Sequence, residues 1–103
     1  MANARTEFLE HIENRKVKCA AIYQGDEWRG ERRIAYLLPI GYDQTKWDAF
    51  LASLNFDYYD GYGVQKLFGD IWYEDGTWSA RREYDGSEWW DYLACPPIPD
   101  TLS

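Results

Sequence analysis

The chain has 103 residues, enough for one domain with one hydrophobic core and too few for two. Its 6 Trp, 9 Tyr and 4 Phe argue against disorder and exceed what a core of this size needs. The formal net charge of −7 disfavours direct binding to a phosphate backbone. The sequence also predicts neither a membrane span nor an N-terminal leader. We therefore expect one acidic domain, residues 1–103, in the cytoplasm, with no direct nucleic-acid or membrane contact.

The N-terminal third predicts a helix followed by a β-hairpin. Residues 2–16 favour a helix, because Phe8, Leu9 and Ile12 form an apolar stripe, with acidic residues early and basic residues late. Residues 17–23 and 32–38 are β-prone, and a polar turn around residues 26–30 separates them. This pattern predicts an antiparallel pair.

A second helix is predicted from residue 44 to about residue 55, with Asp43 as its N-cap. Apolar residues recur on one face at helical spacing: Trp47, Phe50, Leu51 and Leu54. The following residues, 55–63, are aromatic, acidic and Gly-containing without periodicity, so we expect an ordered loop there.

The last third predicts a three-stranded antiparallel meander, because Asp75-Gly76 and Asp85-Gly86 each separate two β-prone runs. A two-residue turn at Asp75-Gly76 would place Ile71 on one face with Trp78, and Trp72 on the other with Ser79. The proline-rich residues 95–99 cannot extend a ladder and should run as an extended cover over the sheet.

The expected fold class is therefore α+β, with two helices packed on one face of an antiparallel sheet made of the hairpin and the meander.

No motif in the sequence predicts catalysis. His11 and Cys19 could form a dyad in principle, but a solvent-facing helical His is the better interpretation. Two Cys and one His, without ligand spacing, do not make a metal site, and no glycine-rich phosphate loop is present. Cys19 and Cys95 are expected to be reduced and buried. We expect no enzyme activity, no metal and no cofactor, although carboxylates among Tyr and Trp would also suit a sugar-cleaving cleft.

Charge is unevenly spread and predicts where a partner binds. Residues 1–42 hold six acidic and seven basic residues, whereas residues 43–103 hold twelve acidic and four basic residues. The acidic half would attract a basic partner, although acidity can also serve solubility alone.

Two acidic, aromatic stretches in this half are the candidate binding surface. Tyr and Trp are enriched in binding hot spots, and carboxylates beside them would meet Arg and Lys of the partner. The candidate residues are Asp57, Tyr58, Tyr59, Asp60, Tyr62, Asp85, Glu88, Trp89 and Asp91. The alternative is that alternate aromatics are core, which we expect for Trp47, Phe50, Ile71 and Trp78.

The last third resembles small uncharacterised proteins encoded by phages and other mobile elements. The resemblance rests on Ile-Trp-Tyr-Glu-Asp-Gly-Thr-Trp at 71–78, Tyr-Asp-Gly-Ser-Glu-Trp-Trp at 84–90 and Cys-Pro-Pro-Ile-Pro at 95–99. It implies an anti-defence protein, such as an anti-CRISPR protein or a DNA mimic. The seven bases in residues 1–42 depart from a fully DNA-like charge surface.

The leading functional hypothesis is a non-enzymatic inhibitor whose acidic, aromatic surface blocks a basic site on a nucleic-acid-processing host protein, such as a nuclease. A module that stacks a sugar or nucleotide on exposed rings, and a self-associating protein such as a homodimer, remain alternatives.

Overall fold

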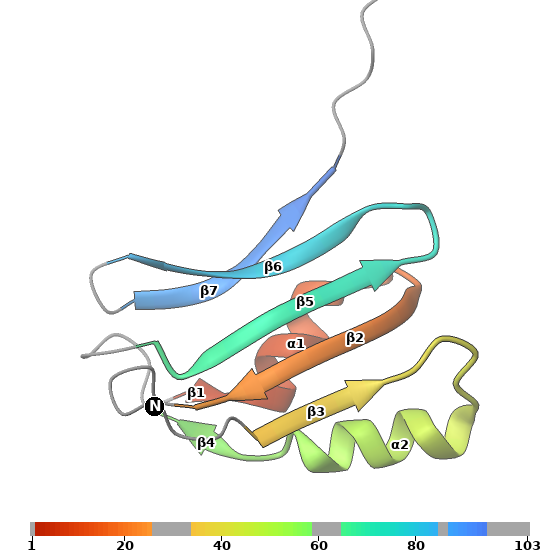
Figure 1. Ribbon diagram of the computed structural model, residues 1–103, viewed down its shortest axis with the longest axis horizontal. Helices are drawn as coiled ribbons and strands as arrows, with labels where there is room; N and C mark the ends of the chain where they lie inside the picture. The colour runs from red at the N-terminus through yellow and green to blue at the C-terminus, as the bar shows by residue number, and fades with distance from the viewer. Residues whose placement is uncertain (1, 26–33, 59–64, 85–86, 95–103) are drawn as a thin grey trace, which may run out of the picture.

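The computed structural model describes residues 2–25, 34–58, 65–84 and 87–94, and it has the expected α+β class. Within these residues, two helices accompany a five-stranded antiparallel sheet of order β3-β2-β5-β6-β7 and a short two-stranded ladder, β1-β4 (Figure 1). In chain order the elements are β1 (Ala2–Asn3), α1 (Ala4–Ile12), β2 (Val17–Gln24), β3 (Ile34–Leu38), α2 (Gln44–Ser53), β4 (Asp57–Tyr58), β5 (Leu67–Tyr73), β6 (Trp78–Tyr84) and β7 (Ser87–Leu93).

Helix α1 is shorter than the sequence predicts. Residues 2 and 3 are extended because they pair with β4, and the Asn3 side chain then caps the helix by accepting from the Thr6 N–H at 3.0 Å. The helix ends at Ile12, and Glu13 follows with a positive φ of 53°. A tertiary pairing therefore sets where this helix begins.

Helix α2 lies where the sequence places it. The Asp43 carboxylate accepts from the Lys46 N–H at 2.9 Å, which confirms the predicted N-cap. The helix runs beside edge strand β3 (Figure 1), and Phe50 and Leu54 reach the core.

The hairpin and the C-terminal strands form one sheet. Strands β2 and β3 pair as predicted, with Ile22 opposite Tyr36. Strand β5 then pairs with the other edge of β2, with Ala20 opposite Ile71, so β2 is an interior strand of the sheet. The three C-terminal strands pair in chain order and extend the hairpin into one five-stranded sheet, so the predicted three-stranded meander does not match the observed sheet exactly.

The turn between β5 and β6 has one residue more than the two predicted from the sequence. The Tyr73 N–H donates to the Thr77 carbonyl at 2.9 Å, and Gly76 follows in the left-handed region with φ 87°. This is a three-residue hairpin loop, so Trp72 lies opposite Trp78 and Ile71 opposite Ser79. A register shift of one residue moves a side chain to the other face, so the predicted partnership of Trp78 with Ile71 is wrong.

The connection between β6 and β7 has the predicted length, since Tyr84 pairs with Ser87. Residues 85–86 and the proline-rich residues 95–99 lie outside the described part of the chain, so the predicted turn type and cover over the sheet stay predictions.

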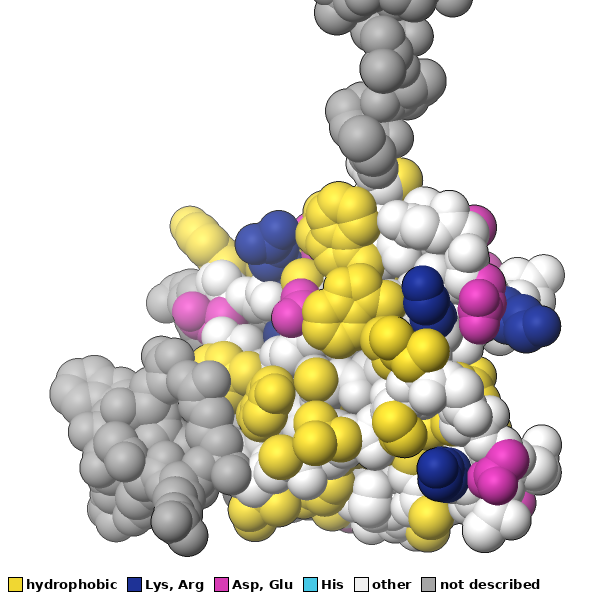
Figure 2. All heavy atoms as spheres, turned by 45° about the vertical axis from the view of Figure 1, so that its right-hand side comes forward, with side chains coloured by type: hydrophobic (Ala, Val, Ile, Leu, Met, Phe, Trp, Pro, Cys, Tyr) yellow, Lys and Arg dark blue, Asp and Glu magenta, His cyan; other side chains and the backbone are white. Residues whose placement is uncertain are grey.

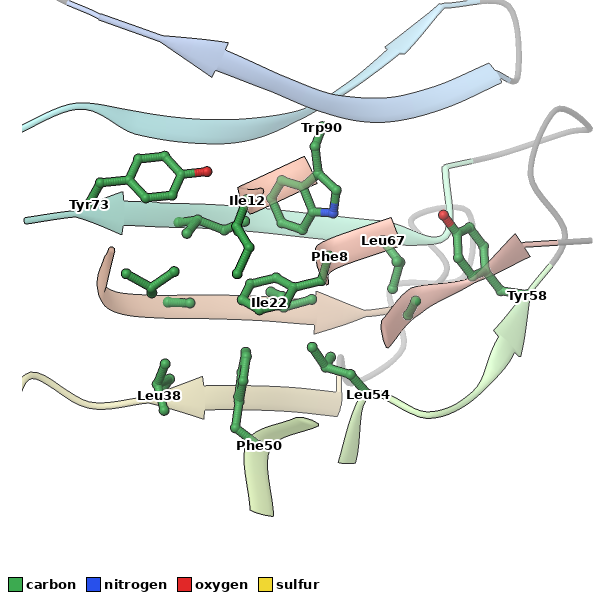
Figure 3. Close-up of a cluster of buried hydrophobic side chains, with 14 residues drawn as sticks. Phe8, Ile12, Ile22, Leu38, Phe50, Leu54, Tyr58, Leu67, Tyr73 and Trp90 are labelled. Atoms are coloured by element: carbon green, nitrogen blue, oxygen red, sulfur yellow. The ribbon is translucent and has the colours of Figure 1, made fainter. Parts of the chain in front are cut away.

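The core lies between the helices and one face of the sheet. Helix α1 lies behind the sheet in Figure 1, and side chains from both helices converge on the strands in Figure 3. The Phe8 ring, which is fully buried, contacts the Phe50 ring edge-on at 5.4 Å between centroids. The core residues are Ala4, Phe8, Ile12, Val17, Ala20, Ile22, Leu38, Phe50, Leu54, Tyr58, Leu67, Ile71, Tyr73 and Trp90. The core assignment is thus correct for Phe50 and Ile71, while Trp47 packs half-buried against it.

Candidate functional site

The face of the sheet turned away from α1 is a candidate binding surface. Because alternate side chains of a strand point to opposite faces, the pairing register assigns this face directly. We call it the open face; it consists of Ala35, Leu37, Cys19, Ala21, Tyr23, Phe68, Asp70, Trp72, Trp78, Ala80, Arg82, Trp89, Asp91 and Leu93. Figure 2 views it obliquely, with hydrophobic side chains along its middle and few charged ones among them. An antiparallel sheet commonly leaves one face to water, but that face is then usually polar.

Tryptophans dominate the open face. Trp72 and Trp89 keep 41% and 42% of their surface exposed, and Trp78, directly opposite Trp72, is half-buried. A hollow of about 290 Å³ adjoins Trp72 and is lined also by Lys18, Cys19 and Ile40. Exposed indole rings beside an apolar hollow are the usual anchors of protein interfaces.

Cys19 is free but not buried, contrary to the expectation for both cysteines. It is half-exposed on the open face, opposite Trp72. Cys95 lies outside the described residues.

One carboxylate stands in the middle of the open face. Asp70 lies on the central strand β5 between Ala21 of β2 and Ala80 of β6. It is half-buried, and its side chain has no hydrogen-bond or ion-pair partner among the residues that the structure describes. In contrast, Asp91 at the sheet edge lies 3.5 Å from the Arg82 guanidinium.

Two residues expected at the binding surface, Glu88 and Tyr58, are buried instead. The Glu88 carboxylate is completely enclosed, lies 2.5 Å from Arg81 Nη2 and accepts from the backbone N–H groups of Lys66 and Leu67 at 2.7 and 3.0 Å. A paired, hydrogen-bonded carboxylate tolerates this burial. Glu88 thus fixes the start of β5 against β7 and does not present its charge to solvent.

Tyr58 belongs to the same buried cluster. Its hydroxyl donates to the Glu7 carboxylate and accepts from Arg81 Nη2 at 3.0 Å. Burial, and then the hydrogen bond to Glu7, raise the pKa of Tyr58 well above its usual value. Arg81 Nη1 lies 3.7 Å from Glu7, so the cluster ties α1 and β4 to β6 and β7.

The other predicted site residues that the structure describes do not lie together on one surface. Trp89 and Asp91 lie on the open face. Asp57 is exposed on β4, where it accepts from the Asn3 side chain at 3.0 Å. The remaining members, Tyr59, Asp60, Tyr62 and Asp85, lie outside the described residues.

His11 is not solvent-facing, contrary to the sequence interpretation. Its Nε2 lies 2.7 Å from the Ser79 hydroxyl, which lies 2.7 Å from the Tyr73 hydroxyl. The imidazole stacks on Trp90, and burial, together with the nearby Arg15, lowers the pKa of His11. The His–Ser spacing would suit a nucleophile and its base, but Ser79 has no exposed surface on which a substrate could approach.

A groove of about 360 Å³ adjoins this pair on the α1 side of the sheet. It is lined by Glu7, Glu10, His11, Glu13, Arg15 and Trp90. Within the described ranges, no group of three or more His, Cys, Asp or Glu side chains is placed to hold a metal ion. Neither described helix has the length and apolar character to cross a bilayer.

Asp70, Trp72 and Trp78 share one surface, which the sequence pattern did not predict. The signal that would have found them is the turn Glu74-Asp75-Gly76, because a Gly in third position suits a three-residue hairpin loop. That loop gives the observed register and places both tryptophans on the same face.

Comparison with protein-family models, with curated proteins and with solved structures found no match.

Proposed function

We propose that this chain is a non-enzymatic protein-binding module that contacts its partner through the open face. The observation that carries the proposal is the pair of half-exposed indoles, Trp72 and Trp89, on a sheet face that no described element covers. Exposing apolar area of this kind to water costs free energy that binding would recover.

The charge of the molecule supports a basic partner. The net charge is −7, and most of the excess acid falls in residues 43–103, which include β5, β6 and β7. Such a field accelerates encounter with a positively charged surface and repels nucleic acid. The partner is therefore a protein with a basic site, such as a nuclease or another nucleic-acid-processing protein of a host cell.

Binding at such a site would exclude the nucleic acid that the partner normally holds there. This is the action of an inhibitor, and it agrees with the resemblance of the last third to small phage-encoded anti-defence proteins. The module is then a cytoplasmic, phage-type inhibitor that acts by occupancy.

The test is a capture experiment with three versions of the chain. Trp72→Ala/Trp89→Ala removes both indoles, and Leu9→Ala removes an exposed apolar side chain of α1, away from the open face. We expect a basic host protein to be recovered with wild type and Leu9→Ala. The tryptophan variant should recover at least about tenfold less, since hot-spot truncations cost this much or more.

Equal recovery with all three versions would contradict the proposal. A captured nuclease should also lose activity when wild type is added and keep it when the tryptophan variant is added. Circular dichroism of the variant controls for its folding.

A second candidate function is stacking of a planar ligand on the open face, which the hollow beside Trp72 favours. Titration of Trp fluorescence with sugars and nucleotides distinguishes the two functions, because saturable quenching by one small molecule would support the ligand and an unchanged signal would oppose it.

A further inference from the structure

The outer edge of strand β3 has none of the charged side chains that usually protect a sheet edge. Strand β7, at the opposite edge, has Asp91, whereas β3 has no charged residue. The most exposed large aliphatic side chains of the described residues are Ile34, Leu37 and Ile40, with 58%, 61% and 70% of their surface exposed. All three lie in β3 or just after it. An uncharged, apolar edge of this kind is one to which another strand is readily added.

The outward-pointing backbone groups of β3 belong to Ala35 and Leu37. On the other side of β2, the Gly25 N–H donates to the Lys66 carbonyl at 3.1 Å, so Gly25 directs its backbone groups to β5. Successive residues of a strand direct these groups to opposite edges, so Ile22 directs its own to β3, where its partner is Tyr36. The N–H and C=O groups on either side of Tyr36, in Ala35 and Leu37, therefore point away from the sheet, and no described strand pairs with them.

A groove of about 410 Å³ lies at this edge, between β3 and α2. Helix α2 begins near the end of β3 and runs back beside it (Figure 1). The α2 side of the groove is one helical face with two small, exposed residues, Ala49 and Ser53, which leave room beside the strand. The full lining is Ala35, Tyr36, Leu37 and Pro39 of the β3 side and Lys46, Ala49, Phe50 and Ser53 of α2.

We propose that this groove binds an extended segment of a partner protein as an additional strand on β3, with one carboxylate of the segment beside Lys46. The outward groups of Ala35 and Leu37 would hydrogen-bond the backbone of the segment, and the apolar walls would accept its alternate side chains. Among the described residues that line the groove only Lys46 is charged, so it selects an acidic residue at that end. The groove does not include the tryptophans of the open face, so this inference goes beyond the function proposed above.

The charge of the chain favours a different protein over a second copy as the occupant. A second copy of β3 has no acidic residue to place beside Lys46. Two copies would also each carry −7 and repel one another. The same net charge opposes a strongly acidic segment, so a single carboxylate in an otherwise uncharged strand fits best.

The experiment titrates the isotope-labelled chain with three end-blocked heptapeptides of alternating valine and threonine, which carry glutamate, glutamine or lysine near one end. The glutamate peptide should bind most tightly. At saturation, the amide N–H groups of Ala35 and Leu37 should exchange with solvent at least about tenfold more slowly, measured by NMR. The Tyr36 N–H already points to β2 and should change much less. This alternation distinguishes an added strand from apolar contact.

Two substitutions on α2 test the groove with a matched control. Ala49→Gln places a longer side chain in the groove and should weaken binding of the glutamate peptide by about tenfold or more. Ala52→Gln makes the same change at an exposed position of α2 outside the groove and should alter binding by less than about twofold. Both keep a good helix-forming residue, and circular dichroism verifies their folding.

Two further substitutions test the charge and the backbone contact. Lys46→Gln should abolish the preference for the glutamate over the glutamine peptide, a preference of about threefold for an exposed ion pair. Leu37→Pro removes one outward N–H, which a sheet edge tolerates, and should weaken all three peptides.

Four results would overturn the inference: no binding of the glutamate peptide, binding without slower exchange at Ala35 and Leu37, equal affinity for the glutamate and lysine peptides, or equal effects of Ala49→Gln and Ala52→Gln. A dimer in sedimentation velocity whose Ala35 and Leu37 amides are protected without peptide would overturn it in favour of a second copy. Trp72→Ala/Trp89→Ala should bind the glutamate peptide as wild type does, whereas loss of binding would place the peptide on the open face.

Discussion

Single residues decide which acidic side chains remain available for binding. Glu88 and Asp91 are three positions apart on β7, yet one is enclosed and the other is half-exposed. The difference follows from strand alternation, since Glu88 shares the inner face with Trp90, and Arg81 lies opposite Trp90. Acidity in the sequence is therefore a poor guide to the charge that a partner meets.

Removing one charge of the buried Arg81–Glu88 pair should cost more unfolding free energy than removing both charges together. Glu88→Gln leaves the buried Arg81 guanidinium with only the more distant Glu7 carboxylate, 3.7 Å from Nη1, and is expected to lower the free energy of unfolding by about 3 kcal/mol. Replacing both residues, Arg81→Met with Glu88→Gln, should cost clearly less, because both charges of the pair are removed and the amide oxygen at position 88 can still accept from a backbone N–H of Lys66 or Leu67. Urea unfolding of both variants measures this; a double variant no more stable than Glu88→Gln would contradict it.

His11 should make stability depend on pH near neutrality. Burial and Arg15 lower its pKa below 6.5, against the opposing charges of Asp91 and Glu13, so the folded protein binds this proton less tightly than the unfolded chain. The contribution of His11 to folding stability is then fully present above pH 6.5 and is lost as the pH falls through and below that value.

The control for this dependence is His11→Gln, which cannot titrate in this range. Wild type should lose more unfolding free energy than the variant between about pH 7.5 and pH 5.5, measured by urea unfolding at each pH. If wild type and His11→Gln lost equal unfolding free energy over this pH range, groups other than His11 would cause the pH dependence.

At the scale of elements, two glycines in β5 and its turn hold the sheet register. Gly69 has φ 134°, and a Cβ there would lie 2.1 Å from the Ala21 carbonyl oxygen, so only glycine permits this approach of β5 to β2. Gly76 has φ 87° in the β5–β6 turn, with no atom within 4 Å of an added Cβ. Position 69 therefore requires glycine both for its backbone conformation and for the absence of a side chain. Position 76 requires glycine for its backbone conformation alone.

This difference predicts unequal costs for the same substitution. Gly76→Ala should destabilise by about 1–2 kcal/mol, the cost of a left-handed residue. Gly69→Ala should destabilise by about 3 kcal/mol or more, because steric overlap with backbone is added to the strain. Thermal or urea unfolding measures both variants. Equal losses of unfolding free energy would contradict the prediction and would mean that β5 can move away from β2 at little cost.

At the scale of the whole molecule, one sheet face is used for folding and the other is free for contact. Both helices supply the core on one side, with Phe8 and Phe50 in contact. The open face keeps Trp72 and Trp89 half-exposed and an unpartnered Asp70. This separation lets open-face substitutions alter binding while the core keeps the fold, and the proposed capture experiment depends on it.

The amino-acid sequence by itself determined the α+β class, helix α2 with its Asp43 cap and the β2–β3 hairpin, because these depend on local periodicity, capping and turn chemistry. It did not determine the pairing of β5 with β2, which joins residues about 50 apart and buries the inner-face side chains of both strands in the common core. It also did not determine which face each aromatic residue occupies. The β5–β6 turn has one residue more than expected, and this places Trp78 on the open face and not in the core. Because side chains alternate along a strand, the same shift brings Trp78 opposite Trp72 on the surface from which we propose the function.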